Sequence, residues 1–277
     1  MRVSISTAVL KWIAVFSMVL DHSAKILGPV LGIDLALLEH PGRWAFPLFS
    51  FCLVQGWMHT HDRKRYMTRL LWLAVSSQLP FALAFQPGVP VSFHIDLSFV
   101  SMALAGCALL FYLLGRNMGL SFWAALFSAA LLPALRWTQN GVILLAPPLN
   151  VAYTLSLGLG LLYLWEQRRP LAILAAFWGC LCYGLEADYG YCLSGILLIL
   201  LLRAVYTSPH HSALLILLWS LALYGIGQGQ WLYGLSGALA GLFVYFHDGS
   251  RGRYPAAFFY GFYPSHLLFL KILAQWL

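Results

Sequence analysis

Long apolar runs, separated by short polar stretches, make up almost the whole of this 277-residue chain. The run LSGILLILLL at 193–202 shows no alternation of polar and apolar residues, so it favours a helix over a barrel strand. A helix needs about 20 apolar residues to cross a bilayer. The pattern predicts eleven apolar helices, at residues 8–31, 44–58, 66–85, 97–115, 120–135, 141–165, 171–185, 189–205, 213–226, 231–246 and 256–276.

The composition excludes a soluble fold. Hydrophobic residues make up 61% of the chain and charged residues 9%, with a mean hydropathy of +0.79. Soluble domains average about 45–50% apolar and about 25% charged residues. We therefore expect an all-α polytopic membrane protein with about ten or eleven transmembrane helices. It is expected to form a single domain over residues 1–277, with a cavity running through the bundle.

The basic residues indicate the orientation of these helices, because cytoplasmic ends carry an excess of lysine and arginine. With a cytoplasmic N-terminus, the cytoplasmic ends hold Arg2, Arg63, Lys64, Arg65, Arg69, Arg116, Arg168, Arg169, Arg203, Arg251 and Arg253. The opposite side holds Arg43, Arg136, Asp34, Glu39, Asp96, Glu186 and Asp188. The net charge of +7 thus reflects membrane topology, and no nucleic-acid partner is expected.

The first apolar helix carries Lys11, Asp21 and His22, which are costly groups inside a bilayer. Lys11 and His22 are eleven positions apart, so they lie on one helix face, roughly 16 Å apart. The structural interpretation is a set of buried polar groups satisfied by neighbouring helices. The functional one is a substrate or proton path with His22 as general base. Asp21 either orients His22 or, because adjacent helical residues point about 100° apart, pairs with Lys25.

A second polar stretch lies around the next helix. Arg43 begins it, and Pro47 predicts a kink within the helix. The basic run after this helix consists of Arg63, Lys64, Arg65 and Arg69. This run is either a cytoplasmic anchor or a phosphate clamp, since arginine forks suit phosphate oxygens. His59 and His61 have no third ligand at a suitable spacing, so no metal site is expected.

Several blocks resemble the TraX family of conjugative-pilus proteins: LKWIAVFSMVLDH at 10–22, GRWAFPLFSFCLVQGWMHT at 42–60 and RYMTRLLWLAVSSQLPF at 65–81. Further matches are NVAYTLSLGLGLLYL at 150–164, DYG at 188–190 and FYGFYPSHLLFLK at 259–271. A basic residue, ten residues and then a histidine, as at Lys11 and His22, also resembles the acyltransferase 3 superfamily. That family associates an arginine-rich stretch with acyl-CoA, and Arg65 and Arg69 fall there.

The resemblance implies a multi-pass enzyme of the bacterial inner membrane that N-acetylates pilin. Acetyl-CoA would be the co-substrate, and no permanently bound cofactor is expected. Lys11 and the basic run would bind the CoA phosphates, while His22 would deprotonate the acceptor amine. Candidates for substrate or oxyanion contacts are Arg43, Tyr263, His266, Asn150 and Asp188. Pro264 frees a backbone carbonyl, so His266 is expected to line the same cavity as His22; the alternative is an interfacial histidine.

Three other functions stay open. A transmembrane acyltransferase acting on a cell-surface glycan would have the same site chemistry. A secondary transporter would also carry intramembrane Lys, Asp and His, but it would more often show internal repeats. A non-catalytic assembly factor would need neither a cationic CoA site nor a buried base.

Overall fold

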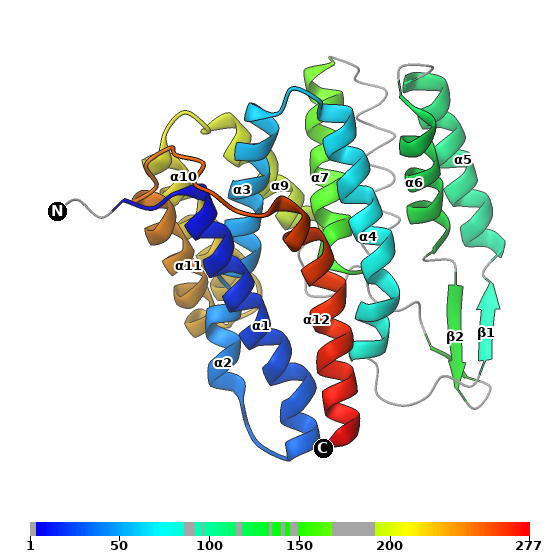
Figure 1. Ribbon diagram of the computed structural model, residues 1–277, viewed down its shortest axis with the longest axis horizontal. Coiled ribbons are helices and arrows are strands. Elements are labelled where there is room, and N and C mark those ends of the chain that lie inside the picture. The colour runs from blue at the N-terminus through cyan, green and yellow to red at the C-terminus, as the bar shows by residue number, and fades with distance from the viewer. Residues whose placement is uncertain are drawn as a thin grey trace. The chain divides into compact units, whose positions relative to one another are not determined.

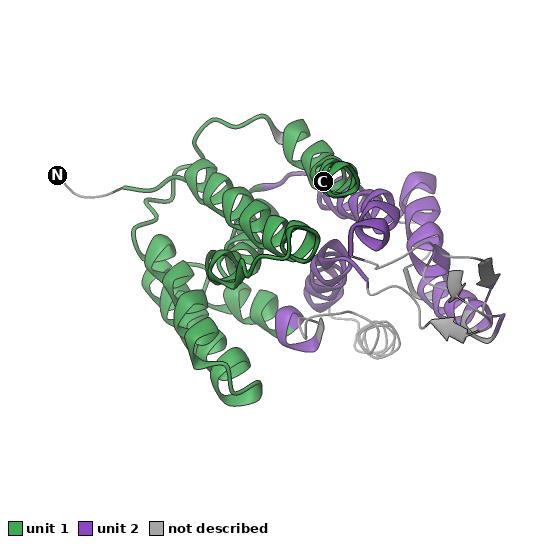
Figure 2. Cartoon of the chain, turned by 90° about the horizontal axis from the view of Figure 1, so that it is seen from below, with its two compact units in different colours: residues 1–59, 197–277 green, residues 60–196 purple. Residues whose placement is uncertain are grey.

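The computed structural model describes residues 4–85, 92–95, 97–114, 118–132, 135–139, 142–144, 149–167 and 192–277. The chain divides into two compact units, shown in different colours in Figure 2. Unit 1 contains Met1–His59 and Leu197–Leu277, and unit 2 contains Thr60–Ile196.

Unit 1 brings the two ends of the chain together. Its helices are α1 (Thr7–Leu31), α2 (Ala36–Gly42), α3 (Ala45–His59), α10 (Pro209–Ser220), the π-helix η4 (Leu221–Gly227), α11 (Trp231–Tyr245) and α12 (Ala256–Trp276). Helix α9 (Cys192–Ala204) begins in unit 2 and continues in unit 1. The first helix and the last lie side by side and run in the same direction (Figure 1). This pairing aligns the polar groups of α1 with those of α12.

The sequence defines both ends of α1. The hydroxyl of Ser6 accepts a hydrogen bond from the Val9 amide and caps the first turn. Gly32 ends the helix in the left-handed conformation, with φ 64°, and its N–H donates to the carbonyl of Gly28. Glycine suits this position because other residues rarely adopt positive φ.

Unit 2 contains the middle of the chain. Its elements are α4 (Arg63–Phe85), β1 (Ser92–Ile95), α5 (Leu97–Leu114), α6 (Leu120–Leu131), β2 (Leu135–Gln139), β3 (Val142–Leu144) and α7 (Val151–Glu166). The strands form an antiparallel sheet in the order β1-β2-β3, with His94 opposite Arg136 and Gln139 opposite Val142. The sequence between β2 and β3 is Asn140-Gly141, a pair typical of tight hairpins.

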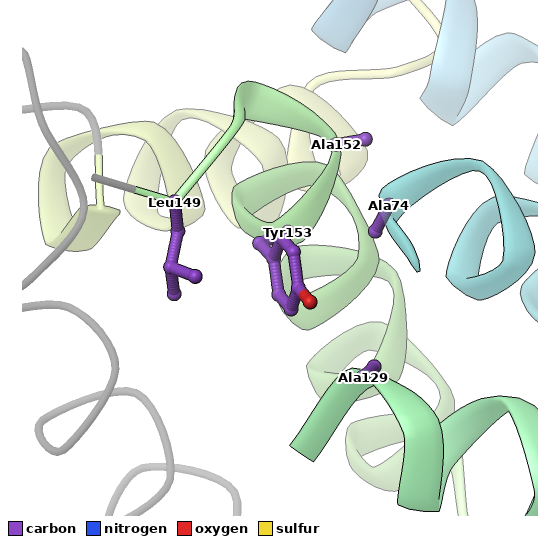
Figure 3. Close-up of a cluster of buried hydrophobic side chains, with 5 residues drawn as sticks. All are labelled: Ala74, Ala129, Leu149, Ala152 and Tyr153. Atoms are coloured by element: carbon purple, nitrogen blue, oxygen red, sulfur yellow. The ribbon is translucent and has the colours of Figure 1, made fainter. Parts of the chain in front are cut away.

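A cluster of small residues lets α4, α6 and α7 pack closely in unit 2. Ala74, Ala129 and Ala152 come from these three helices, and all are buried. Figure 3 shows them in one cluster with Tyr153 and with Leu149, which lies just before α7. Because alanine has only a methyl group, the aromatic ring fills the space between the helices.

The structure confirms the predicted class, an all-α polytopic membrane protein. Within the described residues, three helices are long and apolar enough to cross a bilayer, at Thr7–Leu31, Pro209–Gly227 and Ala257–Trp276. Five predicted helices match the structure to within one residue: 8–31 is α1, 44–58 is α3, 97–115 is α5, 231–246 is α11 and 256–276 is α12. The total number of spans, their orientation, the single domain and a cavity through the bundle stay predictions.

Two boundaries around the sheet were wrong. The helix predicted at 141–165 begins at Val151, and the helix predicted at 120–135 ends at Leu131. The intervening residues contribute strands β2 and β3. Strand β3 falls within the predicted helix at 141–165, because a short apolar run does not distinguish a strand from a helix by periodicity. The sheet and α2 were not predicted, and the segment 171–185 lies outside the described residues.

The position of Pro47 in the structure gives no reason for the kink predicted there. Helix α3 begins at Ala45, so Pro47 lies in its first turn. Backbone N–H groups of the first turn have no intrahelical acceptor, and a proline there removes no helical hydrogen bond.

Candidate functional site

Two histidines from opposite ends of the chain form the centre of the candidate site. Nδ1 of His22 in α1 lies 2.8 Å from Nε2 of His266 in α12. The planes of the two rings are within 7° of each other. His266 is buried, and its Nδ1 lies 2.9 Å from the carbonyl oxygen of Phe262. The structure therefore brings His266 and His22 into contact, as predicted, and a cavity lined by both stays a prediction.

The partners of the two rings determine where their protons lie. The carbonyl oxygen of Phe262 only accepts, so Nδ1 of His266 carries a proton and donates it. In the neutral ring Nε2 of His266 is then an acceptor, and Nδ1 of His22 must be the donor. The lone pair of neutral His22 is therefore on Nε2. This tautomer makes Nε2 the basic position of His22.

Tyr263 lies beside this pair. Its ring centre is 6.4 Å from that of His22 and 5.7 Å from that of His266, and the side chain is buried. Pro264 lies inside α12 between Tyr263 and His266, where it removes one helical hydrogen bond. The structure thus brings three of the predicted residues together.

A chain of alternating charges begins one residue before His22. The Asp21 carboxylate accepts from Lys25, at 3.0 Å, and from Arg43, at 3.3 Å. Arg43 also contacts Glu39 at 3.3 Å, and the hydroxyl of Tyr233 donates to Glu39 at 3.2 Å. Partners of opposite charge offset the cost of holding these groups in an apolar region.

This network assigns structural roles to two predicted residues. Asp21 pairs with Lys25, as one of the two alternatives predicted, and the hydrogen bond of His22 goes to His266. The guanidinium of Arg43 binds two carboxylates and packs 4.6 Å from the ring centre of Tyr233. The catalytic role of Asp21 and the oxyanion role of Arg43 stay predictions.

An open hollow lies next to this network, at the end of α1. Its lining includes Lys25, Gly28, Asp34 and Glu39. Lys25 is three residues beyond His22, so the hollow begins about one helical turn, or ~5 Å, from the histidine pair. Carboxylates and a lysine around an open space suit a polar ligand group near the base.

Lys11 lies on the same side of α1 as His22. Its Nζ is 3.7 Å from the ring centre of Tyr254, just before α12, and 5.8 Å from that of Phe259 in its first turn. Since His22 contacts His266 further along α12, both polar groups of α1 point towards the same neighbouring segment. The prediction that they share one helix face is confirmed.

The predicted basic run lies at the start of α4, in unit 2. Lys64, Arg65 and Arg69 are exposed, and Arg63 forms an ion pair with Glu166 of α7. The carboxylate of Asp62 accepts from the Arg65 amide and caps the helix. Because Lys11 belongs to unit 1, a joint CoA site of Lys11 and this run stays a prediction.

The two remaining candidates have different outcomes. Asn150 caps α7: its Oδ1 accepts from the Ala152 amide, and its Nδ2 donates to the carbonyl of Ala74 and to Gln78. These hydrogen bonds occupy the side-chain polar atoms of Asn150 within unit 2 and give it a structural role. A role of Asn150 in substrate binding stays a prediction. Asp188 lies outside the described residues. Among the residues that the structure describes, no three His, Cys, Asp or Glu side chains form a metal-binding group.

Sequence reasoning missed three residues of the site. Glu39 and Tyr233 complete the charged network, and the ring of Tyr254 receives Lys11. Glu39 carried a usable signal, because it stands four residues before Arg43, the spacing of a helical ion pair. The two tyrosines lie about 190 and 240 residues from their partners, and no local pattern connects them.

Comparisons with known proteins give a family match. The family model described as "TraX protein" matches residues 6–144 and 120–274. An 80-residue stretch is 36% identical to "Probable fimbrial assembly protein FimC, serogroup H1" of Dichelobacter nodosus. The match covers 29% of this chain and 32% of that relative, so the chain spans about a third of the relative's length. No solved structure matches.

Proposed function

We propose that this chain, which belongs to the TraX family, moves an acetyl group from acetyl-CoA to the N-terminal amine of a pilin subunit. The proposal places the protein in the bacterial inner membrane, with several passes through it. A relative named as a probable fimbrial assembly protein supports the connection with pili. The acetyl transfer rests on the resemblance of the sequence blocks and on the chemistry of the histidine pair.

The contact between His22 and His266 is the observation that carries the proposal, because it determines the tautomer of His22. With its proton on Nδ1 and hydrogen-bonded to His266, His22 has its basic lone pair on Nε2. Nε2 takes the proton that the acceptor amine loses as the amine nitrogen attacks the thioester carbonyl. The N–C bond forms, the C–S bond breaks, and the proton passes from His22 to the departing thiolate. The products are the acetylated amine and CoA thiol, with no acyl-enzyme.

Two features of α1 fit the two substrates. Lys11 and His22 are separated by ~16 Å along one face, a length comparable with an extended pantetheine arm. The hollow beyond His22 carries Asp34 and Glu39, whose carboxylates attract the ammonium form of an amine before it is deprotonated. In this arrangement the donor approaches from the Lys11 end and the acceptor from the other end.

The test uses membranes that contain the protein, labelled acetyl-CoA and a pilin acceptor. His22→Ala is expected to lower transfer by at least about a hundredfold, the contribution of a general base, while the variant still inserts. The matched control is His61→Ala, because His61 is exposed just before α4. Full transfer by His22→Ala would exclude His22 as the base.

The name of the relative also favours a second function, a non-catalytic factor for pilus assembly. The two functions differ in what His22→Ala does in cells. An assembly factor would support pilus formation in this variant, and the pilin of the parent strain would carry no acetyl group. Mass spectrometry of the pilin from strains with and without the protein distinguishes acetyl transfer from a non-catalytic assembly role. An acetyl group found on a cell-surface glycan, and not on the pilin, would identify a different acceptor.

A further inference from the structure

The loop between α11 and α12, defined here as the 248–254 loop, is attached to the first turn of α1. Ile5 forms a parallel bridge with His247, just before this loop. The amides of Thr7 and Ala8 donate to the carbonyls of Ser250 and Arg251, at 2.9 and 3.0 Å. The loop therefore has a fixed position beside the start of the helix that carries Lys11 and His22.

Two glycines give the loop its shape. Gly249 and Gly252 have φ of 79° and 65°, which other residues rarely adopt. A Cβ at Gly252 would lie 2.6 Å from the hydroxyl oxygen of Ser6, so only glycine allows the loop to approach α1 this closely. The close approach brings the ring of Tyr254 next to Lys11.

The loop and α1 together present three cations. Arg251 and Arg253 are exposed, and the cationic groups of Arg251 and Lys11 both lie near the ring of Tyr254. The guanidinium carbon of Arg251 is 5.7 Å from the Tyr254 ring centre, and Nζ of Lys11 is 3.7 Å from it. Among the residues that the structure describes, none of the three cations lies within ion-pair distance of a carboxylate.

The one acidic side chain of the loop is already engaged. The carboxylate of Asp248 accepts from the hydroxyl of Ser4 and from the Ser250 amide. It holds the loop to the start of the chain and leaves the positive charge of the arginines uncompensated. Such a cluster on a rigid loop suits a ligand with several anionic oxygens, since arginine binds phosphate through paired hydrogen bonds and lysine as a point charge.

We propose that Lys11, Arg251 and Arg253 bind the phosphate groups of the acyl donor. The inference rests on the proposed function and changes one part of the sequence-based expectation. The phosphate site is built within unit 1, on the helix that carries His22, and the basic run of α4 in unit 2 is not required for it. Lys11 connects the phosphate site with the base, because the acyl arm of the donor extends from Lys11 along α1 to His22.

The experiment measures the Kd of CoA and of dephospho-CoA for the purified protein in nanodiscs of zwitterionic lipid. The double variant Arg251→Gln/Arg253→Gln is expected to bind CoA about 10- to 100-fold more weakly, the range for charge-assisted hydrogen bonds. Its KM for acetyl-CoA should rise while kcat at saturation stays near that of the parent, which excludes misfolding as the cause. Arg203→Gln, the same change in the last turn of α9, is the matched control.

Different failures have different meanings. If the parent protein binds CoA and the double variant binds it equally well, this inference is overturned and the acetyl transfer is untouched. Loss of CoA binding in Arg65→Gln alone would also overturn it, in favour of the α4 run. If the parent binds no CoA at all, the proposed acetyl transfer fails as well.

An anionic lipid headgroup carries the same phosphate chemistry, so a second arm tests it directly. The parent and the double variant are placed in nanodiscs with and without phosphatidylglycerol. Competition between this lipid and CoA in the parent, lost in the double variant, supports a phosphate site in the loop. Arginine variants that change lipid retention but not the Kd of CoA would assign the loop to the membrane surface and overturn the inference.

Discussion

At the scale of single residues, one backbone carbonyl decides which nitrogen of His22 is basic. Phe262 fixes the proton of His266, and His266 in turn fixes the proton of His22. The sequence identified both histidines as candidates. It did not give their pairing, because the two residues are 244 positions apart and the tautomer follows only from the three-dimensional contacts.

Replacing His266 tests this relay. His266→Ala removes the acceptor of the His22 Nδ1 proton, so part of the His22 population will carry its proton on Nε2 and lose its basic position. We expect kcat to fall by about two orders of magnitude, the lower end of a general base's contribution, with the KM for acetyl-CoA unchanged. His266→Gln keeps an acceptor oxygen and should recover part of the rate.

The measurement is kcat and KM for acetyl transfer across a range of pH for the parent and both variants. A purely structural role of His266 would lower the amount of folded protein without changing the pH profile. Parental kcat in His266→Ala would contradict the relay.

At the scale of elements, the close approach of α2 to α1 holds the charged network together. A Cβ built on Gly42, the last residue of α2, would lie 2.4 Å from the Cβ of Asp21. Apolar periodicity does not register a helix as short as α2, and an isolated glycine gives no information about which residue it faces. The sequence therefore predicted α1 well and the α1–α2 contact not at all.

Gly42→Ala is expected to destabilise the protein. The added methyl group forces α2 away from Asp21 and stretches its ion pair with Arg43, at a cost of about 1–3 kcal/mol for overpacking. Gly160→Ala in α7 is the matched control, since a Cβ there meets nothing within 4 Å. The control should be neutral or gain up to about 1 kcal/mol in helix stability. Thermal unfolding in detergent measures both, and equal midpoints for the two variants would refute the predicted clash.

The attachment of the 248–254 loop to the N-terminus should depend on pH. Hydrogen bonds from Ser250 and Ser4 lower the pKa of Asp248 to about 2, below its ordinary value of about 3.9. Because the folded state favours the ionised carboxylate, this stabilisation is complete above about pH 4 and is lost as the pH falls through about 2.

Amide hydrogen exchange at Thr7 and Ala8, corrected for the intrinsic effect of pH, reports this attachment. Protection should fall between about pH 4 and pH 2 in the parent. In Asp248→Asn it should be lower throughout and change little with pH, while Asp62→Asn at the start of α4 should behave as the parent. The same pH dependence in Asp248→Asn would assign the effect to another group.

At the scale of the whole molecule, composition and the length of the apolar runs were enough to predict the fold class. They were not enough to predict which distant segments pair. The apolar excess excluded a soluble fold, and the runs placed α1, α5 and α12 to within one residue. The short sheet of unit 2 was missed because its strands have only three to five residues, and β1 and most of β2 lie in the polar stretches between predicted helices. The contacts that build the site join α1 to α12 and to the 248–254 loop, and nothing local in either segment encodes them.

The parallel direction of α1 and α12 gives the last prediction. Two membrane-spanning helices that run the same way are the first and last of an odd number of crossings, which the eleven predicted spans satisfy. The basic residues predict that α1 begins in the cytoplasm, so Trp276 at the end of α12 should lie on the opposite side. Alkaline phosphatase fused after Leu277 should therefore be active, whereas a fluorescent protein that folds only in the cytoplasm should stay dark there. Because the two helices run in the same direction (Figure 1), the reverse pattern would mean that α1 begins outside the cytoplasm. Lys11 would then lie on the side without acetyl-CoA, which would contradict the donor side of the proposed transfer.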